Sequence, residues 1–175
     1  MPRMTKRRIL IHPDPHLKKV CQPVQEVDER IARLAGDMLE TMYDAPGIGL
    51  AAPQIGILKR MFVMDCTGKE EEPVPMVLID PEIVWASDET VEHEEGCLSV
   101  PEIFETVTRP RAVKVKFMDR SGNQQTEEFD EIWAVCAQHE IDHLNGILFI
   151  DYLSALKRRM ITQKMKKLKR DRARN

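Results

Sequence analysis

The spacing of apolar side chains divides most of the chain into predicted helices and strands. After Asp28, apolar residues recur at helical intervals as far as Met42, and this spacing predicts an amphipathic helix with Asp28 as its N-cap. Short apolar runs at 61–64 and 74–79 predict buried strands. Apolar and polar residues then alternate over 113–118, and a Ser-Gly-Asn turn leads into 124–129, which predicts a β-hairpin.

Two more helices are predicted in the last third of the chain. Asp130 is suited to cap a helix that runs through residues 138–143, and Ser154 is suited to cap a final helix. The predicted apolar face of the final helix consists of Leu156, Met160, Met165 and Leu168.

The segment from Gly47 to Gln54 consists almost entirely of small, uncharged residues. Small residues let another backbone approach closely, and the prolines at 46 and 53 resist regular structure. A phosphate-binding loop is the alternative, but neither G-x-x-x-x-G-K nor G-x-G-x-x-G is present. We therefore interpret the segment as a loop that lines a site, in which Gln54 can both donate and accept hydrogen bonds.

Length and cysteine content favour a cytoplasmic protein with one core. A chain of 175 residues buries about 70% of its unfolded surface, so it needs no disulfide or structural metal to fold. The four cysteines form no C-x-x-C pair, which favours a reducing compartment. The basic N-terminal residues precede only three apolar ones, too few for a signal peptide, and no apolar run is long enough to span a membrane.

The net charge of −3 conceals a strong polarity along the chain. Residues 157–175 contain ten Lys or Arg and one Asp, a charge of about +9, which leaves about −12 on the remainder. Such asymmetry indicates a polyanionic partner for the basic part. A solvated basic helix face is an equally good interpretation.

The chemistry of the chain centres on two histidines, His139 and His143, in the sequence His-Glu-Ile-Asp-His. On a helix the two imidazoles lie about 40° apart on one face, with Glu140 turned to the flank. This H-E-x-x-H pattern is typical of zincin hydrolases, in which the histidines hold a divalent metal and the glutamate takes a proton from water. A solvated amphipathic helix that carries these residues by chance is the alternative.

A third metal ligand is needed, and Cys97 is the best candidate. A histidine ligand six residues after His143 is excluded because Phe149 occupies that position, and the region farther downstream is basic rather than acidic. Cys97 lies in a glycine-flanked turn, although a free cysteine is more often a small buried hydrophobe. His93 lacks a local partner pattern, and we interpret it as a surface or wall residue. A His₂Cys site would leave the fourth position for water, as catalysis requires.

Three segments together resemble the signature motifs of bacterial peptide deformylase: GIGLAAPQ at 47–54, EGCLSVP at 95–101 and QHEIDH at 138–143. The resemblance extends from about Ile9 to the C-terminus, and it includes a long C-terminal helix like that of Gram-negative members. It implies an α+β fold in which short antiparallel β-sheets pack around a central metal-binding helix, with an N-terminal amphipathic helix and a C-terminal helix. The chain would be one domain, 1–175, with the basic helix at about 154–175.

The resemblance implies a hydrolase of protein biosynthesis that removes the N-formyl group from the formyl-methionine of new polypeptides. The implied metal ligands are Cys97, His139 and His143, and Glu140 is the implied general base, which acts on metal-bound water. The expected ion is Fe²⁺, although a His₂Cys site also suits Zn²⁺, Ni²⁺ or Co²⁺.

The family's motifs also imply how substrate would be held. The Gln54 side-chain amide and the Leu98 backbone N–H would stabilise the oxyanion, and the backbone of Ile48 and Gly49 would pair with the substrate. The methionine side chain would enter a pocket that includes Ile132, Val135 and Cys136. Helical spacing independently places these three residues within about 60° of the histidine line, which indicates an apolar group beside the metal, although a core-packing helix would show the same stripe.

The chain departs from the family pattern at three positions outside the motifs. Glu102 stands where many members have glycine, Phe104 where some have arginine, and Glu131 where glycine is common. None belongs to the predicted chemistry, and they affect the predicted pocket rim.

The predicted partners are formylmethionyl nascent peptides and, through the basic tail, the ribosome. We expect a monomer, and no membrane or DNA partner. Two other functions remain open: a general metallopeptidase, whose third-ligand patterns the chain lacks, and a catalytically silent, ribosome-associated metal protein.

Overall fold

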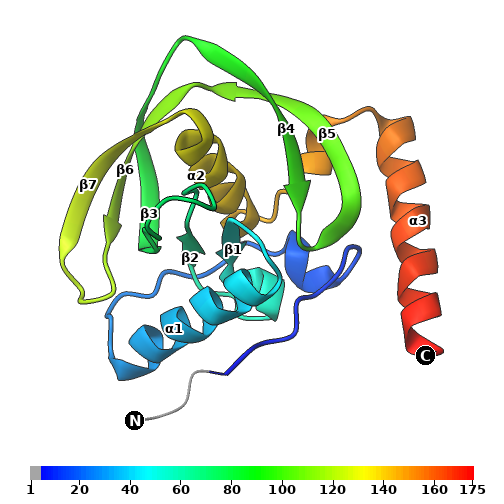
Figure 1. Cartoon of the computed structure of the whole chain (residues 1–175), viewed down its shortest axis with the longest axis horizontal. Helices are drawn as coiled ribbons and strands as arrows, with labels where there is room; N and C mark the ends of the chain where they lie inside the picture. Colours follow the sequence, from blue (N-terminus) through cyan, green and yellow to red (C-terminus); the bar gives the residue numbers. More distant parts are fainter. Residues whose placement is uncertain (1–4) are drawn as a thin grey trace.

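The computed structural model describes residues 5–175; residues 1–4 of the predicted domain lie outside the described part. Within it, three α-helices combine with two antiparallel sheets (Figure 1), which confirms the predicted α+β class. The helices are α1 (Glu29–Asp44), α2 (Glu131–Leu144) and α3 (Ala155–Ala173). Short 3₁₀ helices η1, η2 and η3 lie at Pro15–Lys18, Ala52–Ile55 and Phe149–Tyr152.

The larger sheet has five strands in the order β1-β2-β3-β6-β7. They are β1 (Gly49–Ala51), β2 (Met61–Met64), β3 (Met76–Ala86), β6 (Ala112–Met118) and β7 (Gln124–Asp130). The β6–β7 hairpin and strand β2 confirm the sequence prediction. The strand predicted at 74–79 is observed as β3, which begins two residues later than predicted. It also continues to Ala86, because its second half pairs with β6 alone.

The smaller sheet is a long hairpin of β4 (Thr90–Cys97) and β5 (Val100–Pro110). Neither strand is among those predicted from the spacing of apolar residues. Only part of one face of this hairpin is buried, so neither strand shows an apolar run, and cross-strand pairing holds the two together. Figure 1 shows the hairpin arching over α2, where β5 contacts the helix.

Strand β2 is buried on both faces, and this sets the positions of α1 and α2. Successive side chains of a strand point to opposite faces. Met61 and Val63 pack into a cluster with α1, whereas Phe62 and Met64 pack into a cluster with α2. The two helices therefore cover opposite faces of the sheet, and α2 lies between the sheet and the β4–β5 hairpin (Figure 1).

Two predicted N-caps are confirmed together with their hydrogen bonds, and the third is confirmed in position only. Asp28 Oδ1 accepts the Ile31 N–H at 2.9 Å, and the Ser154 side chain accepts the Lys157 N–H at 3.2 Å. Asp130 occupies the N-cap position of α2, but its side chain makes no capping hydrogen bond. The entry into α2 instead turns sharply at the next residue, whose φ is 50°.

Two other expectations need correction. The segment 47–54 is not simply a loop, because it contains β1 and most of η2. The predicted apolar face of α3 is wrong in its first turns, where Leu156 and Met160 are 62% and 64% exposed. At about 100° per residue they point well away from the face that carries Ile161 and Met165, which are buried against η1 and η3.

Gly146, just after the end of α2, packs against the N-terminal segment. Its φ is 74°, and a Cβ there would lie 2.5 Å from the Lys18 carbonyl oxygen. Gly146→Ala should lower the free energy of unfolding by more than the roughly 1–2 kcal/mol of a left-handed residue, because the backbone contact adds to it. Urea denaturation measures the change. Gly68→Ala is the control, since its Cβ would meet only the Glu71 side chain, at 3.6 Å or more; equal losses would contradict the prediction.

Candidate metal centre

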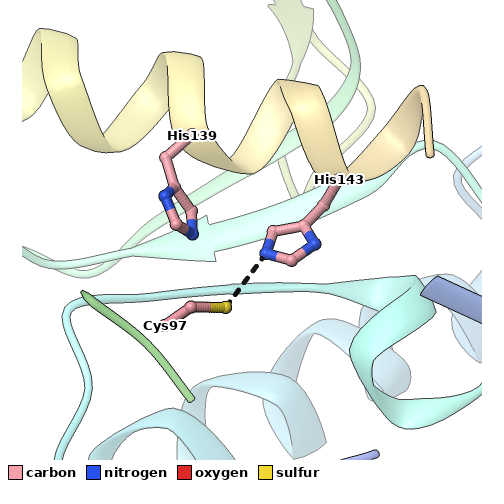
Figure 2. A group of neighbouring side chains, drawn as sticks. All are labelled: Cys97, His139 and His143. Atoms are coloured by element: carbon pink, nitrogen blue, oxygen red, sulfur yellow. Dashed lines mark hydrogen bonds between the residues drawn. The ribbon is translucent and has the colours of Figure 1, made fainter. Parts of the chain in front are cut away.

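Helix α2 places His139 and His143 one turn apart on the face that meets Cys97, the last residue of β4 (Figure 2). One ligand atom from each side chain lies within 4.8 Å of the other two. Cys97 Sγ is 3.3 Å from His143 Nε2, and the two imidazole centroids are 5.0 Å apart. A tetrahedral ion with bonds of about 2.0–2.3 Å separates its ligands by about 3.3–3.8 Å, and the distance between Cys97 Sγ and His143 Nε2 matches such a pair of ligands.

Glu95 orients the first histidine. His139 Nδ1 lies 2.9 Å from Glu95 Oε1, and since a carboxylate accepts, Nδ1 carries the proton and leaves Nε2 as the free ligand atom. A histidine that binds a metal usually donates its other N–H in this way. Phe149 also stacks on the His139 ring, with centroids 5.9 Å apart.

Arg109 in turn holds Glu95. Its Nε and Nη2 donate to the two carboxylate oxygens at 2.6 and 3.0 Å, and both residues are buried. Burial would raise the pKa of Glu95, but the hydrogen bonds from His139 and Arg109 outweigh it and hold the pKa below its usual value. Neither residue is among the site residues predicted from the sequence. Glu95 could have been found, since it lies within the EGCLSVP segment two residues before Cys97, whereas Arg109 carries no local signal.

The electrostatics of the trio suit a cation. Burial lowers the pKa of His143 far below its usual value, so its imidazole is neutral and has a free lone pair. Burial also acts to lower the pKa of His139, but hydrogen bonds to Cys97 and Glu95 and the charge of Glu140 raise it well above normal. A raised pKa means that the surroundings of His139 favour a second proton, on Nε2, and so favour positive charge at that atom. A divalent ion bound there would supply this charge in place of the proton.

Glu140 lies beside the trio with an unused oxygen. It is buried, and in the described part of the chain its Oε1 has no hydrogen-bond partner and lies 3.9 Å from His143 Nε2. Burial, together with the nearby charge of Glu95, raises its pKa to about 7. The sequence analysis placed Glu140 on the flank of the ligand face, and the structure agrees.

Gln54 points its amide nitrogen at the trio. The Ala51 N–H donates to Gln54 Oε1 at 2.9 Å, which fixes the amide so that Nε2 donates to Ser99 Oγ at 3.1 Å and lies 3.6 Å from Cys97 Sγ. Leu98 follows Cys97 in the two-residue turn between β4 and β5. The structure therefore brings the predicted donors Gln54 and Leu98 to the same place.

A pocket of about 730 Å³ opens in front of the trio. Its walls include the remaining predicted site residues, Ile48, Gly49, Ile132, Val135 and Cys136. A Cβ on Gly49 would collide with Glu140 Oε2 and lie 2.9 Å from Cys136 Sγ, so a larger residue there would displace the Glu140 carboxylate. His93 also lines the pocket, but among the described residues the metal-binding group consists of Cys97, His139 and His143 alone.

Comparison with known proteins agrees with this geometry. Residues 6–159 match the family model described as polypeptide deformylase. The chain belongs to the polypeptide deformylase family.

Relatives and solved structures support the same assignment. A peptide deformylase of Phenylobacterium zucineum (strain HLK1) is 54% identical over 164 residues, which cover 94% of this chain and 97% of that protein. One of Rhizobium meliloti (strain 1021) is 53% identical over 164 residues, 94% of each chain. The crystal structure of a peptide deformylase from Ehrlichia chaffeensis has a TM-score of 0.93 and 39% identity, and the match covers 97% of this chain and 99% of that one. The predicted family is confirmed.

Two departures from the deformylase pattern fall where the backbone favours glycine. Glu102 and Glu131, at positions where glycine is common in the family, have φ values of 67° and 50°. An L residue in this region is strained, so each glutamate carries a local cost that glycine would avoid. Glu131 is compensated in part, because its N–H donates to the Arg111 carbonyl and its carboxylate accepts from the Arg111 side chain. Phe104 is exposed at the pocket rim.

We predict that removing the sulfur atom of the trio weakens metal binding. Cys97→Ser should lower the zinc content of the purified protein well below one ion per chain after dialysis against a chelator, because a neutral hydroxyl is a far weaker ligand than a thiolate. Elemental analysis measures the ratio. Cys66→Ser is the matched control, since Cys66 is half-buried and lies outside the trio. Full zinc retention in Cys97→Ser would rule out Cys97 as a ligand.

Proposed function

We propose that this protein hydrolyses the formamide bond of formyl-methionine at the N-terminus of newly synthesised polypeptides, releasing formate and a free amine. Its family membership supports this activity. The observation that carries the proposal is the juxtaposition of a metal-binding trio with Glu140, whose buried oxygen has no partner among the described residues, at the base of the pocket.

The bound ion would be a Lewis acid that polarises the formyl carbonyl and makes water a nucleophile near neutral pH. Glu140 acts as the general base and then as the general acid. Its Oε1 accepts a proton from the attacking water and returns it to the methionine nitrogen as the C–N bond breaks. Burial raises the pKa of the Glu140 carboxyl group, which makes it a stronger base than an exposed glutamate and suits it to take a proton from water.

Gln54 and Leu98 stabilise the negative charge that develops on the formyl oxygen. Gln54 Nε2 is aimed at the trio because its own carbonyl oxygen is held by Ala51. The Leu98 N–H belongs to the turn that follows the ligand Cys97. A preorganised donor of this kind contributes roughly 2.7–4 kcal/mol to transition-state stabilisation.

The open edge of β1 would hold the peptide backbone. In an antiparallel pair, successive residues turn their N–H and C=O groups alternately towards and away from the partner strand. The Ile48 carbonyl accepts from the Asp65 N–H at 2.9 Å and so faces β2, unlike the substrate pairing expected for the Ile48 backbone, whereas Gly49 presents its groups to the open edge. Ile48 contributes its exposed side chain, and Ile132, Val135 and Cys136 would take the methionine side chain.

The proposed ion is Fe²⁺, the metal that the sequence resemblance implies. The donor set of one thiolate and two imidazoles supports a first-row transition metal rather than Mg²⁺ or Ca²⁺, and Zn²⁺, Ni²⁺ and Co²⁺ would also fit it.

We propose a cytoplasmic, monomeric enzyme built as one domain. The four cysteines are free, which agrees with a reducing compartment, and all residues of the proposed site come from one chain. None of the helices in the described part of the chain has the length and apolar character needed to cross a membrane.

The proposed base can be tested without disturbing the ligands. Glu140→Gln should retain the metal but lower kcat for a formyl-Met peptide by about 100-fold or more, because the amide cannot accept the proton. Formate release and metal content are measured together. Glu128→Gln, an exposed change on β7, is the control. Near-normal turnover in Glu140→Gln would rule out this role, and a wild-type protein that binds metal but releases no formate would favour the catalytically silent alternative.

The ribosome is the proposed partner of α3. Ile161 and Met165 of this helix are buried, so truncation would expose core, and charge reversal on its exposed face is the cleaner test. Changing Lys164, Lys167 and Arg170 to Glu should abolish salt-sensitive co-sedimentation with ribosomes, since these side chains would meet phosphates. The control is the same charge change at the exposed residues Lys59, Lys69 and Lys116. Unchanged sedimentation would leave α3 as a solvated basic face.

A further inference from the structure

A chain of polar side chains leads from the metal centre to the surface. Beyond Glu95, Arg109 Nη1 donates to Asp142 Oδ2 at 2.9 Å, and the Tyr152 hydroxyl donates to the same oxygen at 2.7 Å. The Arg109 guanidinium carbon also lies 5.1 Å from the centre of the Tyr152 ring. Tyr152 ends η3 and lies three residues before α3. The contacts therefore connect His139, on α2, with the segment from which α3 begins.

The positive charge of Arg109 is shared between two carboxylates, Glu95 and Asp142. Arg109 is only 4% exposed, and a guanidinium this buried is stable only when several acceptors surround it. Two of its nitrogens donate to Glu95, and the third donates to Asp142. Without the negative charge of Asp142, Glu95 alone would face the full charge of Arg109.

Loss of the Asp142 charge would also affect His139, the proposed metal ligand. Glu95 Oε1 accepts from both His139 Nδ1, at 2.9 Å, and Arg109 Nη2, at 3.0 Å, so the two donors compete for one oxygen. A stronger pull from Arg109 weakens the bond to His139, which makes the imidazole a poorer base and leaves its ring less firmly oriented. Asp142 belongs to the same helix as both histidines, yet its carboxylate is used by Arg109 and Tyr152.

We propose that Asp142 and Tyr152 are positioning residues for the metal centre, which hold Arg109 so that Glu95 keeps His139 basic and oriented. This inference rests on the proposed metal site. Tyr152 contributes in two ways: its hydroxyl donates to Asp142, and its ring covers the Arg109 guanidinium. Tyr152 itself is 53% exposed, so the chain of contacts ends at the surface.

The effect should be measurable as metal affinity. Loss of a direct partner of a ligand costs about 10- to 100-fold in affinity, and Asp142 and Tyr152 act one step farther back. We expect Tyr152→Phe to weaken Zn²⁺ binding about threefold and Asp142→Asn about tenfold, each mainly through faster dissociation. Tyr152→Leu, which also removes the aromatic cover, should exceed Tyr152→Phe.

The chain offers a matched control in its other tyrosine. The Tyr43 hydroxyl donates to Asp65 Oδ2 at 2.6 Å, and this pair lies outside the chain of contacts that leads to His139. Tyr43→Phe therefore removes an equivalent Tyr–Asp hydrogen bond. Zn²⁺ affinity is measured on the full chain by competition with a chelating dye, and Co²⁺-loaded protein reports the ligand geometry through its thiolate-to-cobalt absorption band. Thermal unfolding of each metal-free variant reports stability separately.

The outcomes separate the possibilities. Weaker Zn²⁺ binding and an altered Co²⁺ band in the Tyr152 and Asp142 variants, with Tyr43→Phe unchanged, would support the inference. Equal Zn²⁺ affinity in wild type and Tyr152→Phe, or equal weakening in Tyr43→Phe, would overturn it, because the residues would then act only on stability. A wild-type protein that binds no Zn²⁺ or Co²⁺ at all would overturn the proposed metal centre, and the inference with it.

Discussion

The buried ion pair between Glu95 and Arg109 is the interaction on which the site depends. It joins the two strands of the β4–β5 hairpin, and through His139 and Asp142 it attaches the hairpin to α2. Removing either partner would leave a charge at 4–5% exposure with only part of its compensation, and breaking a buried pair in this way costs up to about 3–5 kcal/mol. The pair therefore fixes where Cys97, at the end of β4, meets the histidines of α2.

The scaffold gives this pair a rigid frame. β2 buries side chains on both faces, so the larger sheet cannot shift relative to α1 or α2 without opening one of two apolar clusters. β1 lies at the edge of that sheet and passes so close to Glu140 that a Cβ at position 49 would displace its carboxylate. Glu140, the proposed general base, the trio that could hold a metal ion and the proposed substrate-binding edge are thus parts of one packed unit.

Two of the four residues other than glycine that have positive φ in the described part of the chain lie at this unit. Glu102 lies in β5 next to the pocket, and Glu131 begins the helix that carries the histidines, and both have positive φ. The backbone must turn sharply at Glu102, where β5 leaves the turn that follows Cys97, and at Glu131, where β7 connects to α2. The fold, rather than the residue type, therefore imposes each conformation. The local cost of each glutamate is small against the packing that surrounds it.

Much of the proposed site could be predicted from the sequence because each of its motifs is local. The i, i+4 spacing of His139 and His143 fixes their common face on any helix, and the three motif segments identify the family. Caps such as Asp28 and the β6–β7 hairpin follow from equally local rules. The order of the sheet, strand β5 and the exposure of Leu156 and Met160 could not be predicted, because each depends on what packs against it. Arg109 shows the limit most clearly: in sequence it is an ordinary arginine between Thr108 and Pro110, and only the tertiary structure buries its charge and thereby decides that Glu95, Asp142 and Tyr152 must gather around it.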